Sequence, residues 1–130
     1  MVQTSKDGTE TILLVDDAEP FRSVGQEILN EFGYKVITAS DGESALELYC
    51  NEQKRIDLVL LDLTMPGMNG KECLEELLKV NPMLKVVMTC SGILGGSTRK
   101  LIESRAKGLL SKPYEIGEFP RVIREVLDRD

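Results

Sequence analysis

The sequence contains no histidine, and this absence removes several kinds of chemistry at once. Serine–histidine and cysteine–histidine nucleophile pairs cannot form, and most transition-metal sites lose their commonest ligand. The chain also cannot carry a phosphohistidine of its own. Carboxylates, hydroxyls, lysines and hard cations remain as the groups available for catalysis or binding.

Cysteine is scarce and shows no metal-binding pattern. Cys50, Cys73 and Cys90 have no CxxC spacing, and each lies inside an apolar periodic segment. We expect three small buried hydrophobic residues in a reducing cytoplasm, because a disulfide framework or a metal-thiolate site would need paired spacings.

Long apolar runs are also missing. No stretch approaches the roughly 18–20 apolar residues that span a bilayer, and no signal-peptide pattern opens the chain. We therefore expect a cytoplasmic location without membrane insertion. The formal net charge of −6 argues against direct nucleic acid binding, which needs positive charge to meet the phosphates. The polar residues 1–9 are expected to be a flexible leader before a single domain at 10–130.

Five short apolar runs alternate with segments of helical period. This alternation predicts a doubly wound α/β sandwich around a five-stranded parallel sheet. The predicted strands are 11–15, 34–39, 56–61, 85–90 and 109–110.

Local signals define several helix boundaries and faces. After Pro20 an apolar stripe recurs at helical spacing and Gly33 follows it, which predicts a helix that stops there. The segment from Ser40 to Glu43 has the spacing of a capping box, and Asn69 is expected to cap the third helix. Pro120 is tolerable only in a first helical turn, so the last helix is expected to start near Glu118 or to be kinked. The stripe after Pro20 consists of Phe21, Val24, Ile28 and Phe32.

Polar residues interrupt the apolar runs at the predicted carboxyl ends of the strands, where function gathers in sheets of this kind. Taken singly, each has an ordinary structural explanation: a polar strand end or helix cap, a turn residue, or a solvated surface lysine. Together they supply complementary chemistry from four strand ends. These residues are Asp16, Asp17, Asp62, Ser91 and Lys112.

That set has the parts of a phosphoryl-transfer site. Ionised carboxylates about 4 Å apart repel by about 4 kcal/mol per pair at an effective dielectric near 20, and Mg²⁺ with oxygen ligands would relieve the repulsion. The Asp62 carboxylate can form an acyl phosphate. The Lys112 ammonium and the Ser91 hydroxyl would contact phosphoryl oxygens, while the Thr64 carbonyl completes the metal shell.

The chain resembles the receiver domain of two-component response regulators from Thr11 to about Asp128. Such domains include chemotaxis-regulator-like stand-alone proteins and the receivers of hybrid histidine kinases. The segments that carry the resemblance are Leu14-Val15-Asp16-Asp17, Leu60 to Gly70, Ser91-Gly92 and Ser111-Lys112-Pro113.

The resemblance implies a flavodoxin-like (βα)5 fold and a role for each matching residue. Asp62 would be the phosphoacceptor, Asp17 would ligate Mg²⁺ directly, and Asp16 would act through a metal-bound water. Ser91 would move toward the phosphoryl group and Lys112 would pair with it. The family also implies a metal ligand in the Thr64 carbonyl, switch positions at Gly92 and Leu109, and a cis peptide bond before Pro113.

The resemblance further implies a histidine kinase or a histidine phosphotransfer protein as the phosphodonor. The domain would catalyse its own phosphorylation and slow dephosphorylation, without turning over a separate substrate. A downstream protein would dock on the face formed by residues 95–128. The basic residues between Gly95 and Lys107 fit either this surface or an ordinary solvated helix face.

Four positions depart from the family pattern. Leu109 stands where a tyrosine or phenylalanine is usual, so an aromatic rotamer coupled to Ser91 is unavailable. Arg105-Ala106 replaces a Gly-Ala pair, and Pro120 falls inside the last helix. Thr89 lies two residues before Ser91, but Ser91 fits the switch position better because Thr89 would lie inside a strand.

Three alternatives compete with a phosphoaccepting switch. Leu109 favours a degenerate receiver that works only as a phosphorylation-independent interaction module. A flavodoxin-like nucleotide binder would need a glycine-rich loop in place of Asp16-Asp17. A haloacid-dehalogenase-type phosphatase would need a second aspartate at the position of Thr64.

Overall fold

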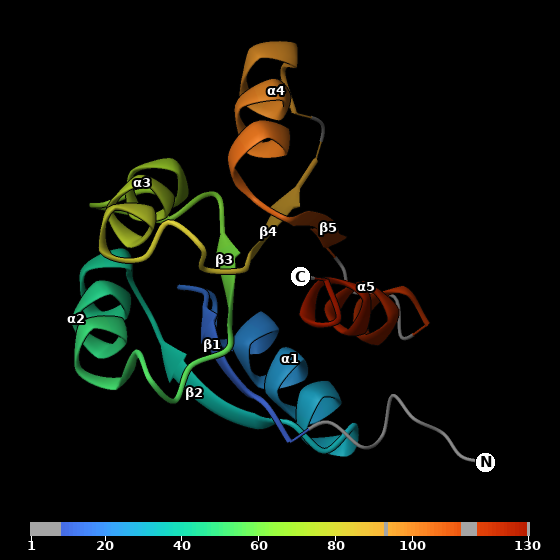
Figure 1. Cartoon of the computed structure of the whole chain (residues 1–130). Coiled ribbons are helices and arrows are strands. Elements are labelled where there is room, and N and C mark those ends of the chain that lie inside the picture. Colours follow the sequence, from blue (N-terminus) through green and yellow to red (C-terminus); the bar gives the residue numbers. More distant parts are fainter. Residues whose placement is uncertain (1–8, 93, 113–116, 130) are drawn as a thin grey trace.

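The structure is a computed structural model that describes residues 9–92, 94–112 and 117–129. Strands and helices alternate through this part of the chain, as the sequence predicted (Figure 1). The elements are β1 Thr11–Val15, α1 Glu19–Glu31, β2 Lys35–Ala39, α2 Gly42–Glu52, β3 Leu58–Asp62, α3 Gly70–Val80, β4 Val86–Ser91, α4 Gly96–Arg105, β5 Gly108–Lys112 and α5 Glu118–Leu127.

The strands form one parallel sheet in the order β2-β1-β3-β4-β5. The order reverses direction at β1, because β2 lies on one side of β1 and all later strands lie on the other. Both β1 and β3 are buried along their whole length, as expected for strands covered on both faces. The predicted doubly wound, flavodoxin-like α/β fold is confirmed.

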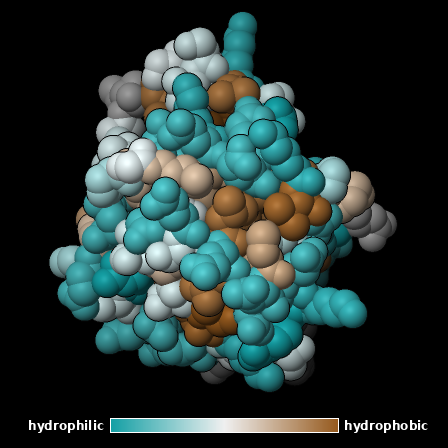
Figure 2. All heavy atoms as spheres, turned by 90° about the vertical axis from the view of Figure 1, so that its left-hand side faces the viewer, coloured by the Kyte–Doolittle hydropathy of each residue, from teal (hydrophilic) through white to brown (hydrophobic). Residues whose placement is uncertain are grey.

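Alternate residues of each strand enter two separate apolar layers. Leu13 and Val59 face α2, α3 and α4, whereas Ile12 and Leu60 face α1 and α5. Figure 1 shows α2 and α3 on the opposite side of the sheet from α1 and α5. The outer face over α2 and α3 is mostly hydrophilic, with small hydrophobic patches (Figure 2).

Side-chain caps define two helix starts. The Asn69 side chain accepts a hydrogen bond from the Glu72 amide at 2.9 Å, and the Glu72 carboxylate accepts one from the Asn69 amide at 3.1 Å, so the predicted cap of α3 is a full capping box. The capping box expected from Ser40 to Glu43 does not form. Asp41 is the N-cap of α2 and accepts from the Ser44 amide at 2.7 Å, because the helix begins one residue later than the spacing suggested.

The apolar stripe of the first helix lies beside the row of residues that the helix buries most deeply. Gly25 and Leu29 are its buried residues, whereas Val24 is 47% exposed. The stripe and the row through Gly25 are adjacent on the helix, and the sheet packs more closely against the row that contains the small residue. Ile28 and Phe32 still pack against the core from its edge.

Two further predictions, the start of the last helix near Pro120 and the burial of the cysteines, can be compared with the structure. The last helix begins at Glu118, with Pro120 buried in its first turn, as the proline predicted. Cys73 and Cys90 are buried as expected, but Cys50 is exposed, so that prediction was wrong for one residue. Cys50 lies on the outer face of α2, whose buried residues include Ala45 and Tyr49.

Cationic side chains fix the end of α5 to the amino-terminal edge of the sheet. Lys85 Nζ donates to the carbonyls of Leu127 at 2.7 Å and Arg129 at 2.5 Å. Arg124 pairs with Glu10 at 2.7 Å, just before β1. These contacts satisfy helix-terminal carbonyls and place positive charge at the negative end of the helix dipole.

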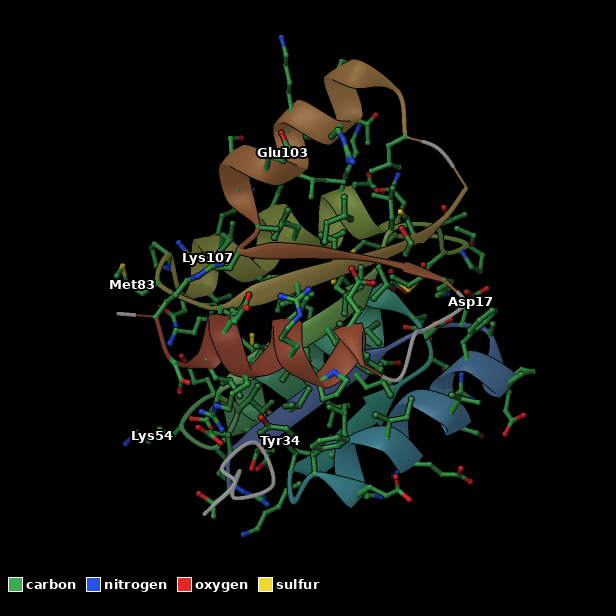
Figure 3. The ribbon with its side chains drawn as sticks, turned by 90° about the vertical axis from the view of Figure 1, so that its right-hand side faces the viewer. Asp17, Tyr34, Lys54, Met83, Glu103 and Lys107 are labelled. Carbon is green, nitrogen blue, oxygen red and sulfur yellow. The ribbon has the colours of Figure 1, made fainter. Side chains whose placement is uncertain are left out.

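The two ends of the sheet differ in character. Figure 3 shows Asp17 at one end, with Lys107 and Met83 at the other. Within the described residues, no helix combines the length and the apolar character needed to cross a membrane. The leader expected at residues 1–9 falls outside the described part except for Thr9.

Candidate functional site

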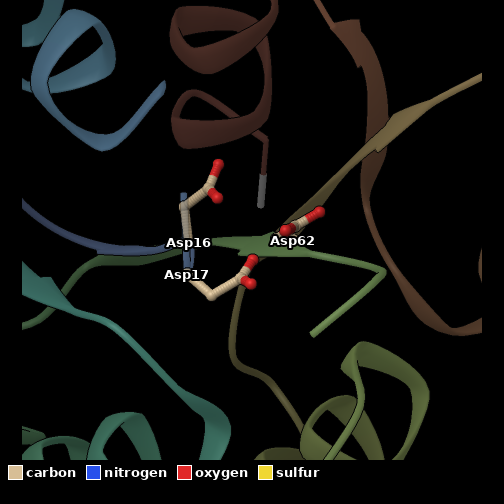
Figure 4. Close-up of side chains that lie close together, drawn as sticks. All are labelled: Asp16, Asp17 and Asp62. Carbon is tan, nitrogen blue, oxygen red and sulfur yellow. The ribbon is translucent and has the colours of Figure 1, made fainter. Parts of the chain in front are cut away.

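Two acidic strand ends meet because β1 and β3 are neighbours in the sheet. Val15 pairs with Leu61 in the parallel register, and the next residue of each strand is an aspartate. Asp16, Asp17 and Asp62 offer carboxylate oxygens that all lie within 4.8 Å of one another. Figure 4 shows the three side chains at these adjoining ends. The structure therefore brings together the acidic residues that the sequence singled out.

Asp16 is fully buried, and several of its atoms have defined partners. Oδ1 accepts a hydrogen bond from the Ala18 amide at 2.9 Å, and the main-chain carbonyl accepts one from Arg22 Nη1 at 2.7 Å. Oδ2 lies 2.7 Å from Lys112 Nζ in an ion pair, but it has no hydrogen-bond partner among the described residues. A buried carboxylate oxygen therefore remains available to a further ligand.

Lys112 provides the positive charge of the pocket. Its side chain is only 5% exposed, and Nζ lies 3.4 Å from Asp62 Oδ2 in addition to its contact with Asp16. The ammonium also lies 4.6 Å from the centroid of the Phe21 ring, within the range of a cation–π contact. Lys112 is thus enclosed by two carboxylates and one aromatic face.

Burial dominates the acid–base properties of Asp62, which is 3% exposed. It raises the pKa of the Asp62 carboxyl from 3.8 to about 6, because the charged form loses its hydration. The Lys112 ammonium and the Thr64 amide, 3.4 Å from Oδ1, lower this pKa, while the Asp16 charge raises it further. A cation in the pocket would favour the ionised carboxylate that a nucleophile requires.

The donor set fits a magnesium ion. Three carboxylates converge, one of them has a buried oxygen with no hydrogen bond to any described residue, and all the donors are hard oxygens. Asp17 is exposed while Asp16 and Asp62 are buried, so the cluster has an open side toward solvent. Such a site can exchange a small ion and admit a phosphoryl donor without unfolding.

The remaining predicted residues lie on β4 and β5 or directly after β4. Ser91 is the exposed last residue of β4 and pairs in register with Lys112 of β5. Gly92 follows with φ of 81°, a conformation that side chains other than glycine rarely adopt. Leu109 is half-buried against the apolar layer under α4. The prediction of a cis peptide bond at Pro113 concerns a residue outside the described part of the chain.

Three neighbouring residues were not singled out from the sequence. Phe21 contacts the Lys112 ammonium, and Arg22 binds the Asp16 carbonyl. A Cβ on Gly70 would overlap the Asp62 carbonyl oxygen and the Leu63 backbone, so only glycine fits where α3 crosses the end of β3. The available signal was their closeness in sequence to the acidic segments, which does not specify a contact.

Comparison with known proteins identifies the family. The model of the response regulator receiver domain matches residues 12–124. Sporulation initiation phosphotransferase F of Bacillus subtilis is 35% identical over 122 residues, covering 91% of this chain and 94% of that protein. The chain belongs to the response regulator receiver family. The resemblance drawn from the sequence motifs is therefore confirmed.

Some relatives are much longer proteins. Sensor kinase CckA of Brucella abortus is 31% identical over 126 residues, which cover 97% of this chain but only 13% of that protein. Receiver sequences similar to this one thus occur as a small part of sensor kinases.

The fold comparison agrees with the family assignment. The crystal structure of the CheX-CheY-BeF3-Mg+2 complex from Borrelia burgdorferi matches with a TM-score of 0.88 at 26% identity, covering 97% of this chain and 100% of that chain. The similarity therefore extends over almost the whole (βα)5 sandwich.

Proposed function

We propose that this receiver domain accepts a phosphoryl group on Asp62 in a Mg²⁺-dependent reaction and thereby changes a partner surface. The observation that carries the proposal is the enclosure of Asp62, which lies within 4.8 Å of two other carboxylates and 3.4 Å from a buried ammonium. A binding-only module has no need of this costly arrangement, because three acidic groups repel one another unless positive charge joins them.

The reaction transfers a phosphoryl group from a nitrogen atom of the donor to an oxygen atom of Asp62. An Asp62 carboxylate oxygen forms the new P–O bond while the P–N bond of a donor phosphohistidine breaks. The electron pair of the P–N bond goes to the imidazole ring of the donor, which takes up a proton. Hydrolysis returns Asp62 to its carboxylate when water attacks the phosphorus. The domain is thus a self-modifying switch without a separate substrate.

Mg²⁺ would be held by Asp16, Asp17 and Asp62, with the Thr64 carbonyl as a further ligand. By the family pattern, Asp17 binds directly and Asp16 acts through a water. The ion supplies positive charge for the phosphoryl oxygens. The presence of BeF3 and Mg²⁺ in the similar Borrelia CheY complex supports this assignment.

Lys112 and Ser91 would bind the transferred group. The Lys112 ammonium already lies 3.4 Å from the Asp62 carboxylate, so it can contact a phosphoryl oxygen attached there. Ser91 sits beside Lys112 at the end of β4 and would donate its hydroxyl to another oxygen. Gly92 allows the backbone after Ser91 to adopt its turn, while Leu109 takes the place of the usual aromatic switch residue.

The proposed donor is a histidine kinase or a histidine phosphotransfer protein. Since this chain contains no histidine, a donor phosphohistidine would lie outside it, and the sensor-kinase and phosphotransferase relatives support such a donor. The face of residues 95–128 is the proposed output surface. Arg99 and Lys100 of α4 are exposed there in an otherwise acidic chain.

The test is phosphorylation of the intact chain by acetyl phosphate with Mg²⁺, followed by intact mass. The wild type should gain one phosphoryl group, Asp62→Asn should gain none, and EDTA should abolish the reaction. Asp57→Asn is the matched control, because Asp57 stands just before β3 at the other end of the same strand. An unchanged wild-type mass at saturating donor would instead support the interaction module that Leu109 favours.

A further inference from the structure

Asp16 positions both Phe21 and Lys112. Phe21 lies in the first turn of α1, where Asp16 Oδ1 accepts the Ala18 amide and the Asp16 carbonyl accepts Arg22 Nη1. The other carboxylate oxygen of Asp16 contacts Lys112 at 2.7 Å. The start of the helix and the position of the ammonium are therefore fixed against one another.

The ring holds the ammonium without occupying its hydrogen-bond donors. A lysine ammonium has three N–H groups, whereas the face of an aromatic ring attracts positive charge through its quadrupole. At 4.6 Å from the ring centroid, Lys112 Nζ is held on one side while its donors can turn to oxygen atoms on the other. A carboxylate at position 21 would compete for those donors.

The ring can act on the ammonium throughout the reaction. In the structure, Asp16 and Asp62 attract the ammonium directly, at 2.7 and 3.4 Å. A cation in the pocket would offset this attraction, and the phosphoryl oxygens would then replace the carboxylates as partners of Lys112. The attraction of the ring does not depend on the carboxylate charges, so it can hold the ammonium while these partners are exchanged.

We infer that Phe21 is a positioning residue for phosphoryl transfer, acting through the face of its ring on the Lys112 ammonium. This inference rests on the proposed function of Asp62. Two properties of the Phe21 side chain could act on the lysine, and the sequence alone does not distinguish them. One is apolar bulk, which leucine would also supply, and the other is the negative face of the ring.

The test compares three chains in the acetyl phosphate reaction with Mg²⁺. Phe21→Leu keeps apolar bulk and should slow the reaction by about three- to tenfold, the range expected for loss of a partly desolvated cation–π contact. Phe21→Tyr keeps the ring and should stay within about twofold of wild type. Val24→Ala is the control one turn along α1, where the side chain is 47% exposed and outside the pocket.

A double-mutant cycle separates positioning from general damage. In a Lys112→Met background, Phe21→Leu should have no further effect, because its partner is already gone. A slowing by the same factor in both backgrounds would mean that residue 21 acts through packing alone, and would overturn the inference. The Mg²⁺ affinity of Phe21→Leu should match that of wild type, and its unfolding curve should show a fully folded protein under the assay conditions.

Side-chain NMR gives a readout that does not depend on the reaction. The Lys112 methylene protons next to Nζ should be shifted upfield by the ring current in wild type and Phe21→Tyr, and not in Phe21→Leu. If wild type and Phe21→Leu react equally fast, this inference alone is overturned. A wild type that takes up no phosphoryl group overturns the proposed function, and this inference with it.

Discussion

The ammonium of Lys112 lies closer to Asp16, at 2.7 Å, than to Asp62, at 3.4 Å. The residue proposed to carry phosphate is therefore not the main partner of the lysine in this state. The lysine compensates the charge of the cluster as a whole, and each group in the pocket affects the cost of burying the others.

Removing the lysine should destabilise the chain most when no metal is present. Lys112→Met leaves two buried carboxylates without their cation, so we expect the free energy of unfolding in EDTA to fall by about 3 kcal/mol. Millimolar Mg²⁺ should reduce this loss, since the ion replaces the missing charge. Urea unfolding with and without Mg²⁺ measures both effects. Lys100→Met, at an exposed site on α4, should change neither curve, and an equal loss there would contradict the explanation.

Asp62 should make the stability depend on pH in an unusual direction for an aspartate. Its pKa is raised from 3.8 to about 6, so the folded state holds this proton more tightly than the unfolded state does. The resulting stability is fully present below pH 3.8 and is lost as pH rises through about 6.

Asp62→Asn should therefore be more stable than wild type at pH 7.5 in EDTA, by about 3 kcal/mol at the upper limit. The difference should shrink toward zero near pH 4, where the wild-type carboxyl is largely protonated. Urea unfolding over a pH series checks this, with Asp57→Asn as the control. A variant that is less stable than wild type at pH 7.5 would show that ionised Asp62 stabilises the metal-free fold.

Gly70 should tolerate no side chain. An added Cβ overlaps backbone atoms of Asp62 and Leu63, which cannot rotate away, so Gly70→Ala should cost about 1–3 kcal/mol and slow phosphorylation. Gly96→Ala is the matched control at the first residue of α4, because a Cβ there meets nothing within 4 Å. Thermal unfolding and the acetyl phosphate rate should separate the two variants clearly.

The ion pair between Glu10 and Arg124 should stabilise the fold at pH values above the range in which Glu10 titrates. Hydrogen bonding to Arg124 lowers the pKa of Glu10 below 4.5, so the contribution is present above pH 4.5 and is lost as pH falls through the lowered value. Glu10→Gln should cost about 1 kcal/mol at pH 7 and nothing in strong acid. Glu125→Gln, whose partner Arg121 is exposed, should cost less at pH 7 and likewise nothing in strong acid.

The sequence was sufficient to predict the helices and strands, and to predict the edge of the sheet at which the polar residues meet. Apolar runs ending in Asp16 or Asp62 identify strand ends directly, and a parallel sheet must place those ends together. The contact between Phe21 and Lys112 was not predictable in this way. It depends on how the Lys112 side chain extends from β5 toward Asp16 and the first turn of α1, and no local pattern in either segment records that contact.

The details that the sequence left open or predicted wrongly have similar causes. The stripe through Val24 fits a helical period as well as the row through Gly25, and only packing against the sheet decides between them. Cys50 was assigned to the core because its neighbours are apolar, yet it points outward from α2. The predicted fifth strand was too short, because Gly108, Ser111 and Lys112 have weak strand propensity and join β5 through pairing with β4.

Asp16 joins two parts of the molecule that have different tasks. One of its carboxylate oxygens holds the first turn of α1 and the other faces the lysine in the pocket. A change of charge inside the pocket therefore acts on the same carboxylate that fixes the start of α1. Neutralising the pocket and anchoring the helix are consequently two demands on a single side chain.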